Sequence, residues 1–254
     1  MKVLKTDLVR LLSQLIFISF LISCTSELQR GISPTKLVEA RVKEIYSILQ
    51  KVVPVLKVRN SDVKNSNKIQ DIFLGSRQLV EFFIDKKSNQ KMLNEIFSVS
   101  VARTTDLPSG SNVCKDGNCY RVEMYNYALN GTVVGIIDLK NERVVSISFY
   151  KETQPDVPPH LIELALEIAR NDTAVIHSYG ENNQLTTPLM PGTKTALNRT
   201  KCQRSRHLCV APTFVKGDKA LWAIVDLTDL NVAGVRWTNV GETGMAISQR
   251  KMQN

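Results

Sequence analysis

The sequence predicts an α+β protein made of two tandem units, each with one helix packed on an antiparallel β-sheet meander, and preceded by a further helix. Ile136–Phe149 and Ile224–Trp237 share an Ile-x-Asp-Leu pattern followed by a common valine, at an offset of 88 residues. A pair of cysteines lies ahead of each segment at nearly the same offset, and an amphipathic stretch lies ahead of each pair. A unit with one apolar helix face and one apolar sheet face buries both when the helix lies across the sheet.

The first 23 residues have the pattern of an export signal. A basic stretch, 1–10, precedes the apolar stretch Leu11–Ile22, which is too short to span a bilayer because spanning needs about 20 residues. The stretch ends in Leu21-Ile22-Ser23-Cys24, which resembles the bacterial lipobox. The resemblance implies that Cys24 receives a diacylglycerol and anchors the mature protein to the cell envelope. An ordinary signal peptide, or a membrane anchor, with a chance cysteine is the alternative. Thr25 follows where an inner-membrane retention signal has Asp, so we expect the outer membrane in a diderm bacterium.

The segment 24–68 is predicted to hold a helix and a linker. Pro34–Val53 is apolar at helical spacing, with Ser33 as the expected N-cap and Pro34 at the first helical position. Arg59–Lys68 is polar and is expected to form a loop.

The two units are expected at 69–155 and 156–245, with a tail at 246–254. In each, a helix, an extended piece, a cysteine loop, a strand and a hairpin turn follow one another, ahead of two further strands. The expected helices are Ser76–Ile84 and Pro159–Arg170, the extended pieces Phe97–Ala102 and Ala174–Tyr179, the strands Tyr120–Tyr127 and Val210–Val215, and the turns Asn130-Gly131 and Lys216-Gly217. Asp138 and Asp226 are expected to end a strand and to bind the turn that follows.

Four cysteines remain after the signal: Cys114, Cys119, Cys202 and Cys209. An even number in an exported chain favours disulfides, and of the three connectivities we favour the two local pairs. A zinc site with His207 as a further ligand is the alternative, although the wider spacing of the second pair exceeds that of most zinc sites.

The net charge of +9 favours anionic partners, but the basic residues are spread along the chain and no common nucleic-acid-binding motif is present. We therefore expect no nucleic acid as partner. Basic residues do gather around the second cysteine pair, at Arg199, Lys201, Arg204 and Arg206. If the local disulfide forms, these residues lie on a tight loop that is a candidate binding site for an anion or a protein partner.

The stretch Gly135–Arg170, with Gln154-Pro155 ahead of its helix, resembles the small N-terminal domains of copper amine oxidases. Ala220–Thr238 fits the same pattern less completely. The resemblance implies a cystatin-like fold for both units, in which one helix packs on an antiparallel sheet. Repeats of the peptidase-propeptide (PepSY) type have a similar order of elements and are a competing relative.

The catalytic parts of an amine oxidase are missing from this sequence. Asn126-Tyr127 is followed by Ala128 where the topaquinone motif has an acid, and none of the three histidines forms His-x-His. We therefore expect no catalytic residue, metal ligand or cofactor. The expected function is a non-catalytic lipoprotein that binds an envelope protein. An accessory role in a copper- and quinone-dependent amine-oxidase system, and a PepSY-like protease inhibitor, are the alternatives.

Overall fold

The computed structural model describes residues 35–239, apart from 60, 108–113, 115–117, 181–188, 193–200 and 203–206. The chain divides into two parts. Residues 1–34 lie outside the described residues, and Thr35–Asn254 forms one compact body that contains both repeat units. The signal segment with Cys24, the residues Arg199, Arg204 and Arg206, and the tail 246–254 also lie outside the described part.

The described part contains two sheets, and the α+β prediction is confirmed. The first sheet has the order β1-β2-β3-β4-β5, in which β1 is parallel to β2 and the other neighbours are antiparallel. Its strands are β1 (Val55–Leu56), β2 (Asn94–Val101), β3 (Cys119–Asn126), β4 (Gly131–Asp138) and β5 (Arg143–Lys151). The second sheet is antiparallel, with strands β6 (Leu189–Gly192), β7 (Cys209–Lys216), β8 (Lys219–Asp226) and β9 (Asn231–Asn239).

Fine details of the backbone recur between the two sheets. A β-bulge follows Ile136 in the first sheet and Ile224 in the second. The turn after each bulge contains a residue with a left-handed backbone, Glu142 or Leu230. Each of these pairs is separated by the same 88 residues as the sequence repeat. The duplicated pattern therefore encodes two equivalent three-stranded meanders.

The helices differ more from expectation than the strands. The helix α2 spans Lys36–Leu49 and its N-cap is Thr35, whose hydroxyl accepts from the backbone N–H of Val38, so Ser33 is not the cap. The first unit's α-helix, α3 (Ser66–Leu74), begins inside the stretch expected to be a loop. The expected helix Ser76–Ile84 is instead the 3₁₀ turn η1 (Arg77–Phe82).

In the second unit, α4 (Pro159–Asn171) has the expected bounds, with a proline at its first position. The stretch Ala174–Tyr179, expected to be extended, lies in the helix α5 (Thr173–Tyr179). The carboxylate of Asp172 caps α5 by accepting from the backbone N–H groups of Ala174 and Val175. This cap satisfies two otherwise unpaired donors and starts a helix where β-branched residues suggest a strand.

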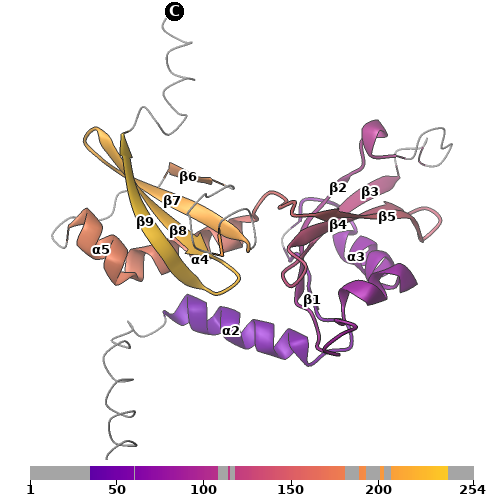
Figure 1. Cartoon of the computed structure of the whole chain (residues 1–254). Helices are drawn as coiled ribbons and strands as arrows, with labels where there is room; N and C mark the ends of the chain where they lie inside the picture. The colour runs from indigo at the N-terminus through magenta and orange to yellow at the C-terminus, as the bar shows by residue number, and fades with distance from the viewer. Residues whose placement is uncertain are drawn as a thin grey trace, which may run out of the picture. The chain divides into compact units, whose positions relative to one another are not determined.

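Each sheet has helices packed on one face (Figure 1). The core of the first sheet joins α3 and η1 to β3 and β4, through buried residues that include Ile69, Phe73, Leu79, Val122, Met124, Val133 and Ile137. The core of the second joins α4 and α5 to β7 and β8, through buried residues that include Leu161, Leu164, Ala165, Val175, Phe214, Leu221 and Val225. Three aromatic residues of the first unit, Phe97, Tyr125 and Tyr127, belong to the second core.

Gly135 marks a close approach between α3 and β4. A side chain at this position would overlap the ring of Phe73, which is fully buried. The equivalent position of the second unit is Ala223, which is buried in the core that contains residues of α4 and α5. The close packing of Phe73 thus explains why the first unit has glycine at this position.

Gly135→Ala is expected to lower the free energy of unfolding by about 1–3 kcal/mol, because overpacking forces the buried ring of Phe73 to move. Denaturant unfolding measures the change. Adding Phe73→Leu to Gly135→Ala should recover part of the loss, since the smaller side chain leaves room for the new methyl group. Full stability of Gly135→Ala alone would contradict the packing.

Candidate functional site

The four cysteines form two local disulfides, Cys114–Cys119 and Cys202–Cys209, as favoured from the sequence. The Cα atoms are 5.4 Å apart in the first pair and 5.6 Å apart in the second. Such disulfides are typical of proteins that fold in an oxidising, exported environment.

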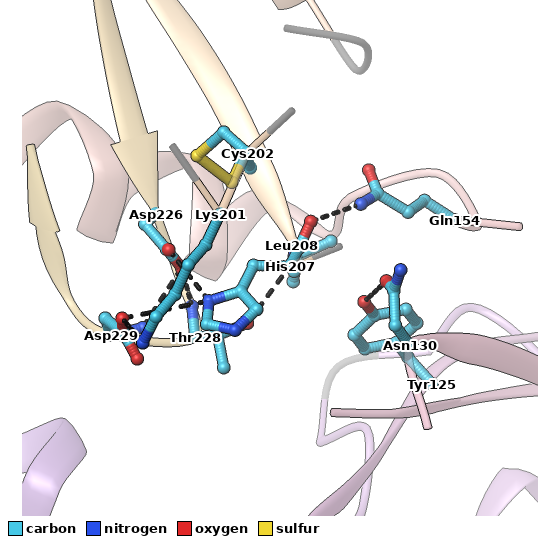
Figure 2. Close-up of a disulfide and its surroundings, with 11 residues drawn as sticks. Tyr125, Asn130, Gln154, Lys201, Cys202, His207, Leu208, Asp226, Thr228 and Asp229 are labelled. Atoms are coloured by element: carbon cyan, nitrogen blue, oxygen red, sulfur yellow. Dashed lines mark hydrogen bonds and ion pairs between the residues drawn. A yellow bond between two sulfur atoms is a disulfide. The ribbon is translucent and has the colours of Figure 1, made fainter. Parts of the chain in front are cut away.

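The candidate site is built around the Cys202–Cys209 disulfide, which lies at the start of β7 with both cysteines buried (Figure 2). In the sheet register, Cys209 pairs with Asp226, the last residue of β8. Cys119 pairs in the same way with Asp138, the last residue of β4. A disulfide beside the strand-ending aspartate is therefore a feature of both units.

The buried carboxylate of Asp226 organises the turn after β8. Its Oδ1 accepts from the backbone N–H groups of Thr228, at 2.9 Å, and Asp229, at 3.1 Å. Its Oδ2 lies 2.8 Å from Nδ1 of His207, within the disulfide loop (Figure 2). The prediction that this aspartate binds the following turn is confirmed, and the same carboxylate also fixes the loop.

Further hydrogen bonds hold both ends of the disulfide loop. Lys201 donates to Oδ2 of Asp229 at 2.7 Å, and this ion pair raises the pKa of the lysine. The backbone O of His207 accepts from Nε2 of Gln154 at 2.6 Å, and the backbone N–H of Leu208 donates to Oγ1 of Thr228 at 3.2 Å (Figure 2). The ends of the loop are therefore fixed to the sheet and to the chain between the two units.

Two groups of side chains in this site have possible ligand atoms close enough to one another to hold a metal ion. The first group is Cys202, Cys209 and Asp226, and the second is His207, Asp226 and Asp229. Zinc binds cysteine as the thiolate, but both sulfur atoms of the first group are joined in the disulfide. In the second group, Asp226 accepts two backbone hydrogen bonds and Asp229 accepts from Lys201. This arrangement fits a rigid loop support better than a metal centre.

The Cys114–Cys119 disulfide has a simpler environment. Asp138 accepts from the backbone N–H of Asn141 at 3.2 Å and from its side-chain amide at 2.7 Å. Arg143 adds a longer contact of 3.5 Å. These hydrogen bonds hold the pKa of Asp138 below its ordinary value. No histidine appears in this environment, so the imidazole contact is particular to the second unit among the described residues.

Of the four basic residues expected to bind a ligand, Lys201 is the one that the structure describes. Its side chain is mostly exposed, and its ion pair with Asp229 directs the ammonium group to the turn after β8. The binding role of Lys201, with Arg199, Arg204 and Arg206, therefore stays a prediction that rests on the sequence.

Sequence reasoning missed a second polar cluster, which joins α2, β2 and α4. Glu95 on β2 is buried and contacts three groups: Arg41 of α2, Tyr127 after β3 and His160 in the first turn of α4. A single acid between apolar residues, with Leu93 ahead of it and Ile96 and Phe97 after it, is the local signal of this cluster. The partners of that acid are 54, 32 and 65 residues away, so the sequence does not indicate them.

The geometry of this cluster satisfies both oxygen atoms of Glu95. Oε1 accepts from Nη1 of Arg41 at 3.3 Å and lies 2.8 Å from Nε2 of His160. Oε2 accepts from the hydroxyl of Tyr127 at 2.7 Å and forms an ion pair with Nη2 of Arg41. The cluster therefore fastens α2 to the sheet and to α4.

The pKa values of Glu95 and Tyr127 agree with an ionised carboxylate that accepts these hydrogen bonds. Burial acts to raise the pKa of Glu95, but the hydrogen bond with His160 and the charge of Arg41 outweigh burial, so its pKa lies below the ordinary value of 4.5. Burial and the charge of Glu95 raise the pKa of Tyr127 well above 10. Glu95 is thus charged and Tyr127 is a protonated donor across the neutral range.

Removal of the Cys202–Cys209 disulfide by Cys202→Ala/Cys209→Ala is expected to lower the free energy of unfolding by about 2 kcal/mol, because the denatured chain gains conformational freedom. Cys114→Ala/Cys119→Ala is the matched control, since it opens a loop of similar length. We expect a smaller loss there, because Cys114 is only half-buried while both sulfur-bearing residues of the second pair are buried. Equal stability of the wild-type protein and both variants would contradict the expectation.

In comparisons with known proteins, no family model matches this chain and no curated protein is significantly similar to it. Among the described residues, every helix is too short or too polar to cross a lipid bilayer.

Proposed function

We propose that this protein is an exported, lipid-anchored binding module that presents the basic loop around the Cys202–Cys209 disulfide to an acidic protein of the cell envelope. The observation that carries the proposal is the fixation of both ends of that loop, by the buried disulfide and the buried Asp226 and by Gln154 of the chain between the two units. A loop whose ends are fixed loses less conformational entropy when it binds a partner.

Export is supported by two independent features, and lipid anchoring is supported by the first of them. The lipobox-like sequence ends at Cys24, and the four cysteines beyond it are joined in disulfides. A cytosolic protein rarely keeps such bonds, because the cytosol is reducing. Acyl chains at Cys24 would hold the folded part at a membrane surface.

The chemistry of the proposed partner follows from the charges on the loop. Lys201, Arg204 and Arg206 lie within or beside the eight-residue disulfide loop, and Arg199 lies just ahead of it. Clustered guanidinium groups bind carboxylates through paired hydrogen bonds. An acidic protein surface is therefore the complementary partner.

The anchor is tested by Cys24→Ser in a bacterial host. We expect the wild-type protein in the membrane fraction with the mass of a diacylglycerol on its N-terminal cysteine. The Cys24→Ser variant should lack this mass and leave the membrane fraction after the signal segment is removed. An unmodified wild-type Cys24 would overturn the anchoring proposal.

The binding role is tested with a photo-crosslinking amino acid in place of Arg206, in the lipid-anchored protein within intact cells of the native host. We expect one discrete adduct, whose partner mass spectrometry identifies as an envelope protein. Lys201→Glu/Arg204→Glu should reduce this adduct at least tenfold. The matched control, Lys86→Glu/Lys87→Glu, changes the same charge at exposed positions far from the loop in sequence and should leave the adduct unchanged. Equal adducts in both variants, or none from position 206, would contradict the proposal.

A further inference from the structure

Apolar side chains are exposed on α2 and just beyond it. Val42 and Tyr46, four residues apart on one helix face, are 51% and 70% exposed, and Val52 is 88% exposed. Single exposed apolar residues are ordinary, but three within eleven positions make this stretch a candidate contact surface for a partner. Tyrosine is also a side chain that favours the boundary between water and lipid.

The charges around this cluster are mainly positive. Lys36, Lys43 and Lys51 are exposed on α2 and directly after it, and Glu39 is the exposed acid among them. The other acid of the helix, Glu44, forms ion pairs with Arg41 and Arg59. The exposed surface therefore combines apolar side chains with excess positive charge, which complements an anionic lipid surface.

Side chains next to this exposed surface fix α2 to the body of the protein. Arg41 reaches the buried Glu95, Ile48 is buried, and Val38 packs on the second core. The helix cannot bury Val42 and Tyr46 by rotating about its axis, because rotation would break the buried ion pair. The exposed face is therefore presented in a fixed orientation.

The length of chain ahead of α2 limits its distance from the membrane. Eleven residues separate Cys24 from Lys36, and an extended chain covers about 3.5 Å per residue, which gives a reach of about 40 Å. A short tether of this kind raises the effective concentration of the helix at the surface to which it is anchored.

We propose that the surface formed by Val42, Tyr46 and Val52 with Lys43 and Lys51, called here the α2 surface, contacts the anionic headgroups of the membrane that carries the lipid anchor. This inference rests on the proposed lipidation of Cys24 for its tether. The contact sets the orientation of the two sheets on the membrane, while the acyl chains supply the anchoring itself.

The first test uses the lipid-anchored protein in vesicles of phosphatidylcholine with 30% phosphatidylglycerol. An environment-sensitive fluorophore is attached through Tyr46→Cys, since the other cysteines are in disulfides or acylated. We expect blue-shifted emission and quenching by a bilayer-borne nitroxide. The same label at Val101→Cys, an exposed position at the end of β2, should show neither effect. Identical emission from both positions would overturn the inference.

The second test separates this inference from the lipid anchor. The unlipidated chain that begins at Thr25 contains the whole compact unit, and its binding to the same vesicles is measured by sedimentation. We expect Tyr46→Ser/Lys43→Glu/Lys51→Glu to weaken binding at least tenfold, and Lys64→Glu/Lys86→Glu/Lys87→Glu to weaken it less than threefold. If the unlipidated chain does not bind the vesicles, or if both sets of substitutions weaken binding equally, the membrane contact of the α2 surface is overturned even if Cys24 is lipidated. An unmodified Cys24 would overturn only the lipid anchor.

Discussion

Replacement of Glu95 by alanine is expected to lower the free energy of unfolding by about 3–5 kcal/mol. The substitution leaves the guanidinium of Arg41 buried without its counter-ion, and it also removes the acceptor of the hydroxyl of Tyr127. The Nε atom of Arg41 already has no hydrogen-bond partner within the described residues, so this side chain has little capacity to compensate. Denaturant unfolding followed by circular dichroism measures the loss.

The matched control combines Glu95→Ala with Arg41→Met. Since this double variant removes both charges, it should be more stable than Glu95→Ala alone. A loss below 1 kcal/mol for Glu95→Ala would contradict the assigned contacts.

The same cluster gives the protein an acid-dependent stability. The pKa of Glu95 is lower in the folded protein than its ordinary value of 4.5, so its contribution is fully present above that value and is lost as the pH falls through the folded pKa. The difference in stability between the wild-type protein and Glu95→Gln should therefore be constant from about pH 7 to about pH 5 and shrink below it. A difference independent of pH down to about pH 2 would contradict this linkage.

Replacement of Asp226 by alanine is expected to give the second large loss, and to lower the free energy of unfolding by about 2–4 kcal/mol. The substitution leaves the backbone N–H groups of Thr228 and Asp229 without an acceptor and removes the partner of His207, in a buried environment. Because the same carboxylate fixes the Cys202–Cys209 loop, cleavage by trypsin after Arg204 and Arg206 should also become faster.

The repeat supplies the control for this prediction, since Asp138 occupies the equivalent position. Asp138→Ala should lower the free energy of unfolding by less than Asp226→Ala does. Arg143 is exposed and the side chain of Asn141 can turn to solvent, so the substitution leaves only one backbone donor, the N–H of Asn141, without its acceptor. An equal loss for both variants, or a larger one for Asp138→Ala, would show that the contacts of Asp226 are not specific to the second unit.

The strands and turns of the two meanders were predictable because local sequence encodes them, whereas β1 and β6 were not expected from the sequence. Short apolar runs that end at Asp138 and Asp226, and turn residues such as Gly217 with its left-handed backbone, specify a meander without reference to distant parts of the chain. The two aspartates act on the turns next to them, so their structural role was also predictable.

The helices of the first unit were harder to predict. The helix α3 has polar residues at its start, and its helical state depends on burying Ile69 and Phe73 against the sheet. The Gln70 side chain, fully buried, adds hydrogen bonds to the backbone of Val58. Such contacts are tertiary, and helix propensity does not contain them.

The sequence by itself determined the duplicated meanders, the local pairing of the cysteines and the turn-binding role of the two aspartates, since each depends on residues that are near in the chain or repeated in it. Only the tertiary structure decided which residues make the buried cluster around Glu95, and that His207 meets Asp226 beside the disulfide. The physical reason is distance along the chain. An ion pair between Arg41 and Glu95 forms only when a helix and a strand 54 residues apart pack together, and no local pattern records that packing.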